Sequence, residues 1–268
     1  MLVFVIPLKS PVASSNWEKV SQLFERTLKS VCNQTSDKFQ VIVVCHQKPT
    51  ISYSHPSVTY LEVDFPISAN PDIRTKRRDR VRKVLTGMVY ARRFKPSYVM
   101  KVDADDCISQ RLAEFVEQNP QCNGWLVNQG YEYQEGSKFI YLRKSNFYRH
   151  CGTSTIIKFD LLDLPLNPEL MDYEELFKYH IPHSKTDEIM ATKGNKLDYL
   201  PFIGAVYIIK TGENTYPRQK KLPEVIKNPS ETVLYLKGLY RNLSSQVLTQ
   251  SIGQEFGLEK VLAIKIAG

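Results

Sequence analysis

The sequence predicts an α/β protein: helices flank a mostly parallel central sheet, followed by a mixed, antiparallel second half and a helical C-terminal tail. Apolar runs of strand length alternate with amphipathic helical segments through the first half, which is typical of a parallel sheet. The hydrophobic fraction of 42% in 268 residues allows a sizeable core. Three carboxylates follow the fourth apolar run, at the edge where an open sheet of this class places its ligand.

The first half contains four predicted strands and two predicted helices. The strands cover residues 2–6, 39–45, 58–63 and 98–102. The first helix covers residues 16–31, where apolar side chains recur at helical spacing after possible N-caps at Ser14, Ser15 and Asn16. The second covers residues 73–93 and carries one apolar face. The carboxyl ends of these strands are expected to converge, bringing Pro7, Cys45 and the Asp cluster together.

The second half has shorter elements. Residues 125–133 and 139–142 predict a hairpin that turns through Glu135 and Gly136. Further strands are predicted at 155–159, 197–200 and 205–210, with a short helix at 187–193. A stretch rich in proline and lysine at 217–223 marks a boundary, and 230–250 and 255–266 read as helical. We therefore expect one domain over residues 1–216 and a helical C-terminal extension, 217–268, packed on it.

Composition limits the partners and the cellular setting. The net charge of +8 favours anionic partners, which include nucleotide phosphates, an acidic membrane surface and nucleic acid. The five cysteines form no C-x-x-C pair, which argues against a structural zinc site or a disulfide scaffold and favours a reduced, cytoplasmic setting. No run is long enough for a signal peptide or a membrane span, so membrane contact would be peripheral, at the inner face.

The most informative stretch is Tyr98-Val-Met-Lys-Val-Asp-Ala-Asp-Asp106, in which a strand delivers Asp103, Asp105 and Asp106 at its end. Aspartate is disfavoured within strands and is seldom buried without a partner. Oxygen-only clusters suit hard divalent ions such as Mg²⁺ or Mn²⁺, often shared with substrate phosphates. The alternative is a solvated turn after a strand. Lys101 points to the same side as Asp103, so we expect it to have a carboxylate partner.

A basic run shortly before this cluster adds to the argument. Lys76, Arg80 and Lys83 share one helix face at i, i+4 and i+7 within the basic run 74–83. This face either is solvated, contacts the phosphates of a diphosphate, or contacts nucleic acid or a membrane.

Two segments downstream are further candidates. The small residues of Cys151-Gly-Thr-Ser-Thr155 either let a substrate approach the backbone closely or form a simple turn. Asp187 and Glu188 follow Thr186 at the start of a predicted helix. One explanation is that acidic residues in the first turn of a helix are stabilised by the helix dipole. The alternative is that Asp187 is a general base that takes a proton from a hydroxyl. A metal pair formed by His180 and His183 would need an unbroken helix, which Pro182 opposes.

The order of these parts resembles glycosyltransferase family 2, which has the GT-A fold. The resemblance covers roughly residues 1–216 and rests on the opening strand, the second strand, the segment Gly87–Arg92 running into the Asp-x-Asp pattern of 103–105, Gly152-Thr-Ser154, and Thr186-Asp-Glu188. It implies a hexosyl transferase that moves a sugar from a nucleotide-diphosphate donor, UDP- or GDP-linked, to a hydroxyl of a saccharide or other acceptor, with inversion.

The resemblance also implies roles for individual residues. Asp103 would contact the nucleoside or ribose of the donor, Asp105 would hold Mn²⁺ or Mg²⁺ at the diphosphate, and Asp187 would deprotonate the acceptor. Arg80 and Lys83 would lie near the phosphates, and Pro7 would line the donor site.

Two departures from the family pattern concern the donor and the metal. Cys45-His46-Gln47 stands where the family commonly places acidic residues that recognise the base. Lys210 stands where many members have a histidine, and its charge could weaken or replace the ion.

Two other functions compete with the transferase. One is a nucleotidyltransferase on a similar sheet, which a Gly-rich phosphate loop would favour, but Pro7-Leu-Lys-Ser-Pro11 contains no glycine. The other is a non-catalytic protein, either a basic nucleic-acid-binding module or a degenerate transferase. No recognisable nucleic-acid motif appears, so we expect no nucleic-acid partner.

Overall fold

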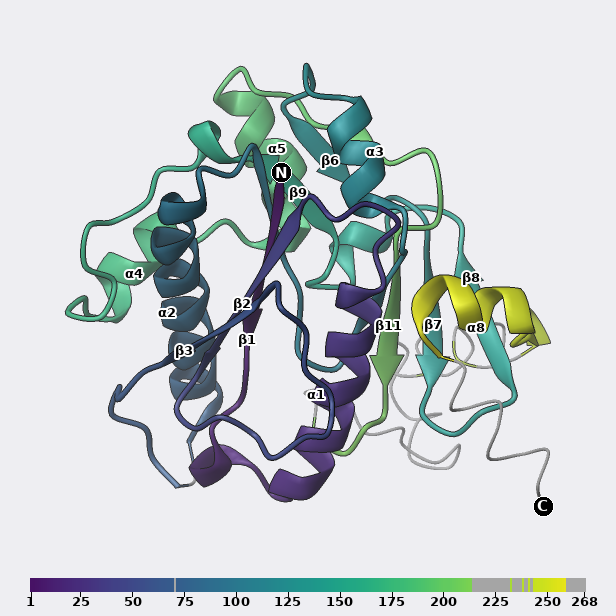
Figure 1. The fold of residues 1–268 in the computed structure, drawn as a ribbon, viewed down its shortest axis with the longest axis horizontal. Coiled ribbons are helices and arrows are strands. Elements are labelled where there is room, and N and C mark those ends of the chain that lie inside the picture. The colour runs from purple at the N-terminus through teal and green to yellow at the C-terminus, as the bar shows by residue number, and fades with distance from the viewer. Residues whose placement is uncertain (70, 214–231, 233–237, 239–240, 242, 259–268) are drawn as a thin grey trace.

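The structure is a computed structural model of the 268-residue chain. It describes residues 1–69, 71–213, 232, 238, 241 and 243–258. The predicted boundary at 217–223, most of the predicted helix at 230–250 and most of that at 255–266 lie outside the described residues. Figure 1 shows helices arranged around a central sheet, with a second, smaller sheet beside it.

The central sheet has seven strands in the order β10-β6-β9-β4-β1-β2-β3. Its first four strands in the chain are β1 (Leu2–Pro7), β2 (Phe39–Cys45), β3 (Val58–Glu62) and β4 (Tyr98–Lys101). All three pairings among them are parallel. The other members are β6 (Gly124–Leu126), β9 (Thr155–Lys158) and β10 (Asp198–Tyr199). Only β9 runs antiparallel to its neighbours, which confirms the predicted mostly parallel α/β class.

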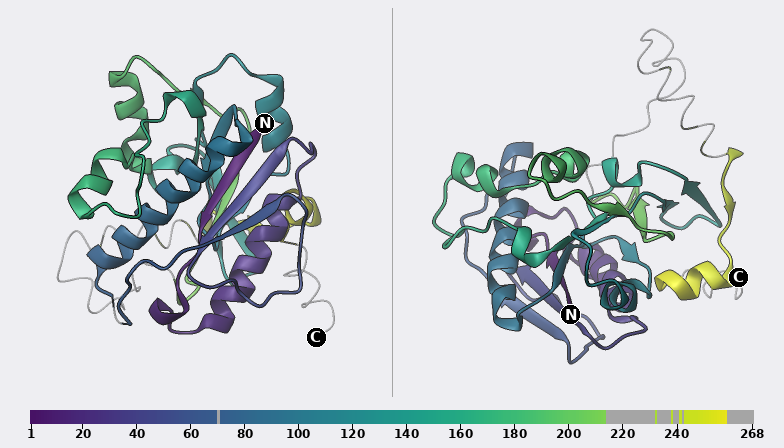
Figure 2. Two further views of the ribbon diagram at one scale, coloured as in Figure 1. Left: turned by 60° about the vertical axis from the view of Figure 1, so that its left-hand side comes forward. Right: turned by 90° about the horizontal axis from the view of Figure 1, so that it is seen from above.

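Helices cover both faces of this sheet, as the two views in Figure 2 show. On one face lie α1 (Trp17–Cys32) and α3 (Leu112–Gln118), and on the other lies α2 (Ile73–Ala91). Alternate residues of β1 serve the two faces: Phe4 and Ile6 join the core with α1, whereas Val3 and Val5 join the core with α2. This alternation follows from the two-residue period of a strand.

Glycine 87 sets how closely α2 approaches the sheet. A Cβ at this position would lie 2.5 Å from Val5 Cγ1 and 2.9 Å from Val44 Cγ2. Because no side chain fits there, the helix packs directly on β1 and β2, and the basic residues of its first turns are held beside the ends of these strands.

The second sheet has five strands in the order β12-β8-β7-β11-β5. These are β5 (Cys107–Ile108), β7 (Gly130–Gln134), β8 (Phe139–Arg143), β11 (Ala205–Ile209) and β12 (Gln246–Val247). Short helices α4 (Tyr173–Tyr179) and α5 (Thr186–Thr192) lie between β9 and β10. Strand β11 lies between β7 and β5, so its side chains reach the segment that follows β4.

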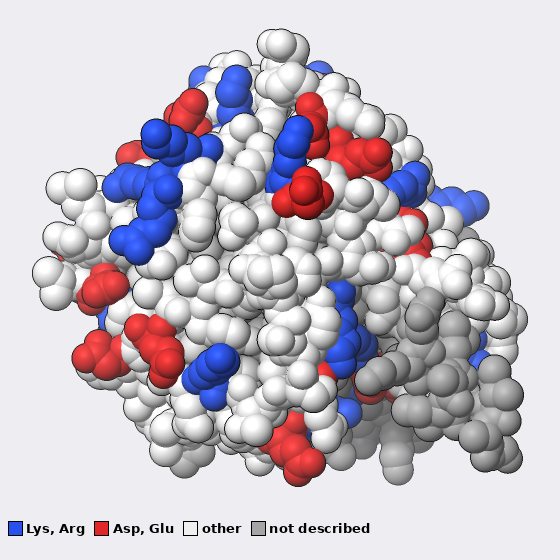
Figure 3. Space-filling model, in the orientation of Figure 1, with Lys and Arg blue, Asp and Glu red and all other residues white. Residues whose placement is uncertain are grey.

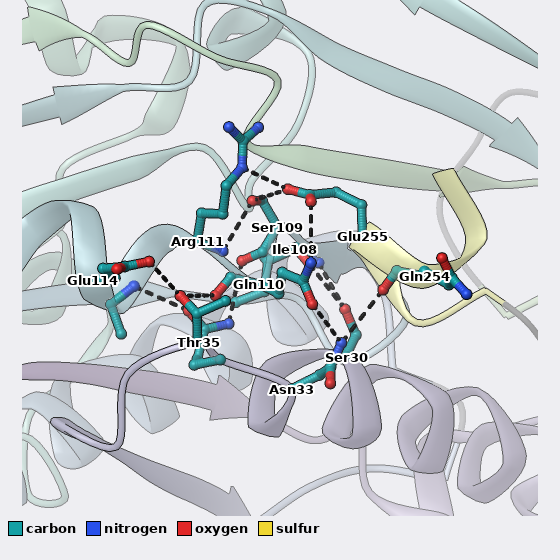
Figure 4. A network of polar contacts seen from close by, with 12 residues as sticks. Ser30, Asn33, Thr35, Ile108, Ser109, Gln110, Arg111, Glu114, Gln254 and Glu255 are labelled. Atoms are coloured by element: carbon teal, nitrogen blue, oxygen red, sulfur yellow. Dashed lines mark hydrogen bonds and ion pairs between the residues drawn. The ribbon is translucent and has the colours of Figure 1, made fainter. Parts of the chain in front are cut away.

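Helix α8 (Gln250–Phe256) docks on the segment around β5 through a polar network (Figure 4). Glu255 accepts from Ser109 Oγ at 2.5 Å and from Arg111 Nε at 3.0 Å. Asn33 Nδ2, at the end of α1, donates to the carbonyl of Gln254 at 3.3 Å. These contacts join residues more than 140 positions apart and hold α8 against the segment around β5 and the end of α1.

Two sequence predictions of local structure are wrong. Residues 125–133 do not form one strand, because the chain leaves the central sheet after Leu126 and joins the second sheet at Gly130. The helix predicted over 230–250 gives way to β12 at Gln246–Val247, where pairing with β8 overrides helical propensity. The hairpin of β7 and β8 and the helix at α5 are confirmed.

Candidate functional site

A cavity of about 680 Å³ opens at the carboxyl ends of β1 and β4, the edge at the bottom of the view in Figure 1. It lies between the starts of α1 and α2 and is closed on a third side by Tyr207 of β11. Five of the six predicted site residues line it: Pro7, Arg80, Lys83, Asp103 and Asp105. The convergence of strand ends predicted from the sequence therefore produces a real cavity with charged walls.

Asp103 is held between two cations. Its Oδ1 lies 3.5 Å from Lys101 Nζ and 3.7 Å from Arg80 Nε. Burial alone would raise the pKa of Asp103, but Arg80 and Lys101 outweigh this effect and lower the pKa to about 2. The carboxylate partner expected for Lys101 is thus confirmed, and Asp103 is a fixed anion at neutral pH.

Gly152 allows this arrangement. A Cβ there would lie 2.2 Å from Asp103 Oδ2 and 2.7 Å from Lys101 Nζ. Next to it, Thr153 Oγ1 accepts from the backbone N–H of Asp103 at 2.8 Å. The small residues after Cys151 therefore serve close packing against the carboxylate, not a simple turn.

Asp105 differs from Asp103 in its environment. Burial, and then the negative charge of Asp103, raise the pKa of Asp105 to about 7. An additional positive charge beside this carboxylate would favour its ionised form. Within the described residues, no three His, Cys, Asp or Glu side chains group closely enough to hold a metal ion alone. The residues fit Mg²⁺ or Mn²⁺ in the mode in which one or two carboxylates bind the ion and substrate phosphates and water complete its coordination.

The third carboxylate, Asp106, is fully buried and ties three segments together. It accepts from Thr153 Oγ1 at 2.6 Å and from the backbone N–H of Ile208 at 3.1 Å. Burial, then Asp105 and Asp103, raise its pKa well above the usual range. Asp106 is therefore a structural member of the cluster, joining the end of β4 to β11 and to the segment before β9.

The basic run of α2 divides between the cavity and helix α4. Lys76, Arg80 and Lys83 line the cavity, which confirms that these three share a face. Arg74 and Arg77 turn the other way: their guanidinium groups lie 4.2 Å and 4.8 Å from the ring centres of Tyr173 and Phe177 on α4. Two of the seven basic residues thus pack against a helix that was not predicted from the sequence, although the Asp172–Glu175 capping box marks its start.

Lys83 is buried and makes contacts within the protein that its predicted role at the phosphates does not require. Its ammonium group is 1% exposed and donates to Leu8 O and to Asp79 Oδ2, both at 2.8 Å. Burial lowers its pKa, and Asp79 opposes this effect. Lys83 joins α2 to the end of β1, and one of its three donors remains for a ligand.

Glu213 was not predicted as a site residue, and its contacts show why. Glu213 Oε2 lies 2.6 Å from Lys9 Nζ, and its Oε1 accepts from the backbone N–H of Asn16 at 2.8 Å and from Ser15 Oγ. This single carboxylate holds the segment after β11 against the start of α1, across about 200 residues. No local sequence pattern predicts a contact between residues so far apart in the chain.

Asp187 lies at the start of α5 and is not among the residues that line the cavity. Its Oδ2 accepts from Tyr148 Oη and Arg149 Nη2, both at 2.8 Å, while its Oδ1 is buried without a hydrogen-bond partner. Burial would raise the pKa of Asp187, but the bonds from Arg149 and Tyr148 outweigh this effect and lower the pKa. Asp187 is therefore ionised at neutral pH, and its second oxygen is enclosed by protein.

The two departures from the family pattern, at His46 and at Lys210, both lie outside the lining of the cavity. His46 Nε2 contacts Phe65 O at 2.9 Å, and the histidine is not among the residues that line the cavity. Lys210 lies in the left-handed region at φ 58° and donates to Gln134 Oε1 at 2.9 Å. It is likewise not among the residues that line the cavity. Neither side chain faces the space where Asp103 and Asp105 lie.

His180 and His183 follow α4 and lie beside the cations of the site. Burial, and then the positive charge of Lys101, lower the pKa of His180 to about 3 and that of His183 to about 4. Both imidazoles are therefore neutral at pH 7. They belong to separate short elements on either side of Pro182, so they do not form a helical metal pair.

The depressed pKa of His180 predicts how stability depends on pH. Between its unfolded pKa near 6.5 and its folded pKa near 3, only the unfolded chain protonates this residue. Its contribution to stability is thus present above pH 6.5 and is lost as pH falls, by about 1.4 kcal/mol per pH unit. Chemical denaturation measures the free energy of unfolding at pH 7 and at pH 5. Between these two pH values, His180→Gln should lose roughly 2 kcal/mol less unfolding free energy than the wild type does. Equal losses in His180→Gln and the wild type would contradict the prediction.

The surface charge on the face of Figure 1 is mixed. Figure 3 shows lysine and arginine side chains gathered on the left, over the region of α2, with carboxylates beside them. The basic residues of the chain are therefore partly balanced on this face. Within the described part of the chain, no helix has both the length and the apolar composition that a membrane crossing needs.

Comparison with known proteins gives structural likenesses of low identity. No protein-family model matches the sequence, and no curated protein matches it. Among solved structures, S. aureus TarS 1–349 is similar over 77% of this chain and 60% of that chain, with 12% identity and a TM-score of 0.42. The same fragment in complex with UDP is similar over 78% of this chain and 60% of that chain, with 12% identity and a TM-score of 0.39.

A second protein with a similar arrangement is the Francisella tularensis 2-C-methyl-D-erythritol 4-phosphate cytidylyltransferase. It is similar over 86% of this chain and 100% of that chain, with 11% identity and a TM-score of 0.38. The present chain spans about three fifths of the TarS fragment. Likenesses at this level assign no function to the chain.

Proposed function

We propose that this protein is a glycosyltransferase that takes a sugar from a nucleotide-diphosphate donor and passes it to an acceptor hydroxyl. One observation carries the proposal: carboxylates and cations together line a cavity of about 680 Å³ at the carboxyl ends of parallel strands. Donor phosphates need cations, and a ribose or a divalent ion needs carboxylates. The cavity supplies both.

Each wall of the cavity has a part in this proposal. Asp103, held ionised by Arg80 and Lys101, accepts hydrogen bonds from hydroxyl groups of the donor. Arg80 and the remaining donor of Lys83 lie near the phosphates, and Pro7 forms part of the wall beside the nucleoside. Asp105 would hold Mn²⁺ or Mg²⁺, which when bound would offset negative charge on the departing nucleotide.

Asp187 is the proposed base. Its carboxylate is ionised at neutral pH, as a general base that takes a proton from an acceptor hydroxyl must be. The hydroxyl oxygen attacks the anomeric carbon, the bond from that carbon to the diphosphate oxygen breaks, and the proton moves to Asp187. A single displacement of this kind inverts the anomeric centre.

A binding experiment tests the donor class. UDP, GDP, UDP-glucose, GDP-mannose, UTP and CTP are titrated calorimetrically, each with Mn²⁺, with Mg²⁺ and with chelator. We expect one nucleoside diphosphate and its sugar conjugate to bind, and to bind more tightly with metal. Binding of triphosphates alone, with release of pyrophosphate, would replace the proposal by nucleotidyl transfer. No binding in any arm would leave the degenerate or nucleic-acid alternatives.

Substitution of Gly152 tests the role of Asp103 without touching it. In Gly152→Ala the new Cβ overlaps Asp103 Oδ2 and forces the carboxylate away from its cations. We expect nucleotide affinity to fall about tenfold, the value of one charge-assisted hydrogen bond. Thr153→Ser, which keeps the hydroxyl between Asp103 and Asp106, should bind as the wild type does. Wild-type affinity in Gly152→Ala would remove Asp103 from the donor site.

A further inference from the structure

A second, smaller cavity of about 70 Å³ adjoins the first. The two share Gly152 and His183, so the second cavity begins where the first ends, beyond Asp103. The proposed reaction does not use this second cavity. Its volume is that of a small group of atoms, not of a sugar ring.

The walls of this second cavity divide into an apolar and a polar part. Helix α2 contributes Val84, Leu85 and Met88, and other aliphatic side chains complete the apolar part. Lys101, Thr155, His180 and His183 form the polar part, and an exposed carboxylate, Asp163, also borders the cavity. A cation enclosed by aliphatic side chains is costly unless an anion accompanies it.

Two charged residues line this cavity: Lys101 lies at its polar end and Asp163 is exposed at its border. Lys101, with its side chain 15% exposed, and Arg80 share the single carboxylate of Asp103. The distance from Lys101 Nζ to that carboxylate, 3.5 Å, is long for a hydrogen bond. Because the ammonium group has three donors, it has more hydrogen-bonding capacity than Asp103 uses.

Neutral donors surround this charge. Thr155 Oγ1 is buried and has no hydrogen-bond partner, although Thr155 lines the cavity. His180 and His183 also line it, and at neutral pH each carries one ring N–H and no charge. One buried cation, one hydroxyl without a partner and two imidazoles thus meet around a space that fits a few atoms.

We propose that the second cavity binds one small anionic group, a carboxylate or a phosphate, carried by a substrate. Lys101 supplies the charge, and Thr155 Oγ1 and the imidazoles of His180 and His183 supply hydrogen bonds. Which substrate carries the group rests on the proposed function: it belongs either to the transferred sugar or to the acceptor. The binding of the anion itself does not depend on that function.

The alternative is that Lys101 serves only to hold Asp103 in place. That role explains the ion pair but not the cavity next to it or the buried hydroxyl of Thr155. The two explanations differ in what they predict for Thr155→Val. If the hydroxyl exists to bind an anion, its removal should raise the melting temperature in anion-free buffer and weaken anion binding.

The experiment uses His180 as a reporter, because it lines the second cavity and is not among the residues that line the first. The imidazole NMR signals of the five histidines are followed while acetate or inorganic phosphate is added to the full-length protein. His180→Gln assigns the reporter signal. We expect a saturable shift of His180, with affinity about tenfold or more weaker in Lys101→Met, because a charge-assisted bond is lost. Lys76→Met, which removes a cation of the first cavity, should leave the His180 response unchanged.

Nucleotide sugars then identify the source of the anionic group. If UDP-glucuronic acid loses affinity in Thr155→Val and UDP-glucose does not, the group belongs to the sugar. If neither nucleotide sugar loses affinity in Thr155→Val but acetate does, the group belongs to the acceptor. The absence of a His180 shift with either anion, or equal affinity in wild type, Lys101→Met and Thr155→Val, would overturn the proposal. Acetate binding without any nucleotide binding would instead retain this site and overturn the proposed transferase.

Discussion

Asp105→Asn is expected to remove the metal-dependent part of nucleotide binding and to lower turnover roughly 100-fold or more. A divalent ion at a departing diphosphate is worth several kcal/mol of transition-state stabilisation, and an amide cannot replace a carboxylate as its ligand. The measurements are calorimetric titration of the donor with Mn²⁺ and with chelator, and initial rates of sugar transfer.

Stability separates this effect from damage to the fold. Burial and the neighbouring Asp103 raise the pKa of Asp105 to about 7, so the ionised carboxylate is unfavourable in the folded protein without a cation. A neutral amide removes this cost, and the melting temperature of Asp105→Asn should hold or rise. Asp160→Asn, an exposed acid outside both cavities, is the matched control and should keep wild-type activity. Undiminished metal-dependent binding in Asp105→Asn would show that the ion is held elsewhere or is not required.

Asp187→Asn is expected to abolish transfer while sparing donor binding. A positioned general base contributes about 10²–10⁴-fold to the rate, and the amide has no comparable basicity. Asp187 lies outside the lining of the donor cavity, so nucleotide affinity should stay within about twofold of the wild type, less than the loss of one hydrogen bond would cause. Steady-state transfer rates and nucleotide titration on the same preparation measure both quantities.

The adjacent acid provides the control for this second prediction. Glu188 is 63% exposed and lies 3.6 Å from Arg149, so Glu188→Gln changes the same ion-pair group without touching the proposed base. It should transfer at close to the wild-type rate. If Asp187→Asn transfers normally, the base lies elsewhere; if transfer and nucleotide affinity fall together with the melting temperature, the Tyr148–Asp187–Arg149 contacts are structural.

Local patterns in the sequence were enough to predict the core of the site. The positions of the first four strands in the chain, their shared carboxyl edge and the shared face of Lys76, Arg80 and Lys83 were all predicted correctly. Each follows from a short-range periodicity, two residues in a strand or 3.6 in a helix, which packing against a core preserves. The position of the Asp cluster after a buried strand is a pattern of the same kind.

Other features depended on partners far along the chain. The three aspartates look alike in the sequence, yet Asp103 is held by cations, Asp105 faces the cavity and Asp106 is buried under Thr153. Their pKa values diverge accordingly, because burial and neighbouring charge, not residue type, set the ionisation of a carboxylate. No spacing rule could have assigned these three roles.

The sequence by itself therefore determined the α/β class, the location of the charged edge and several of the residues that line it, among them Arg80, Asp103 and Asp105. Only the tertiary structure decided that residues 124–134 are divided between two sheets, that Arg74 and Arg77 of the basic run pack against α4, and that Glu213 closes the site against α1. It also created the second cavity, where Lys101 from β4 meets Thr155 of β9 and the histidines that follow α4. Local periodicity encodes which face a residue takes, whereas the neighbours on that face come from contacts between distant segments, which the packing of the whole core selects.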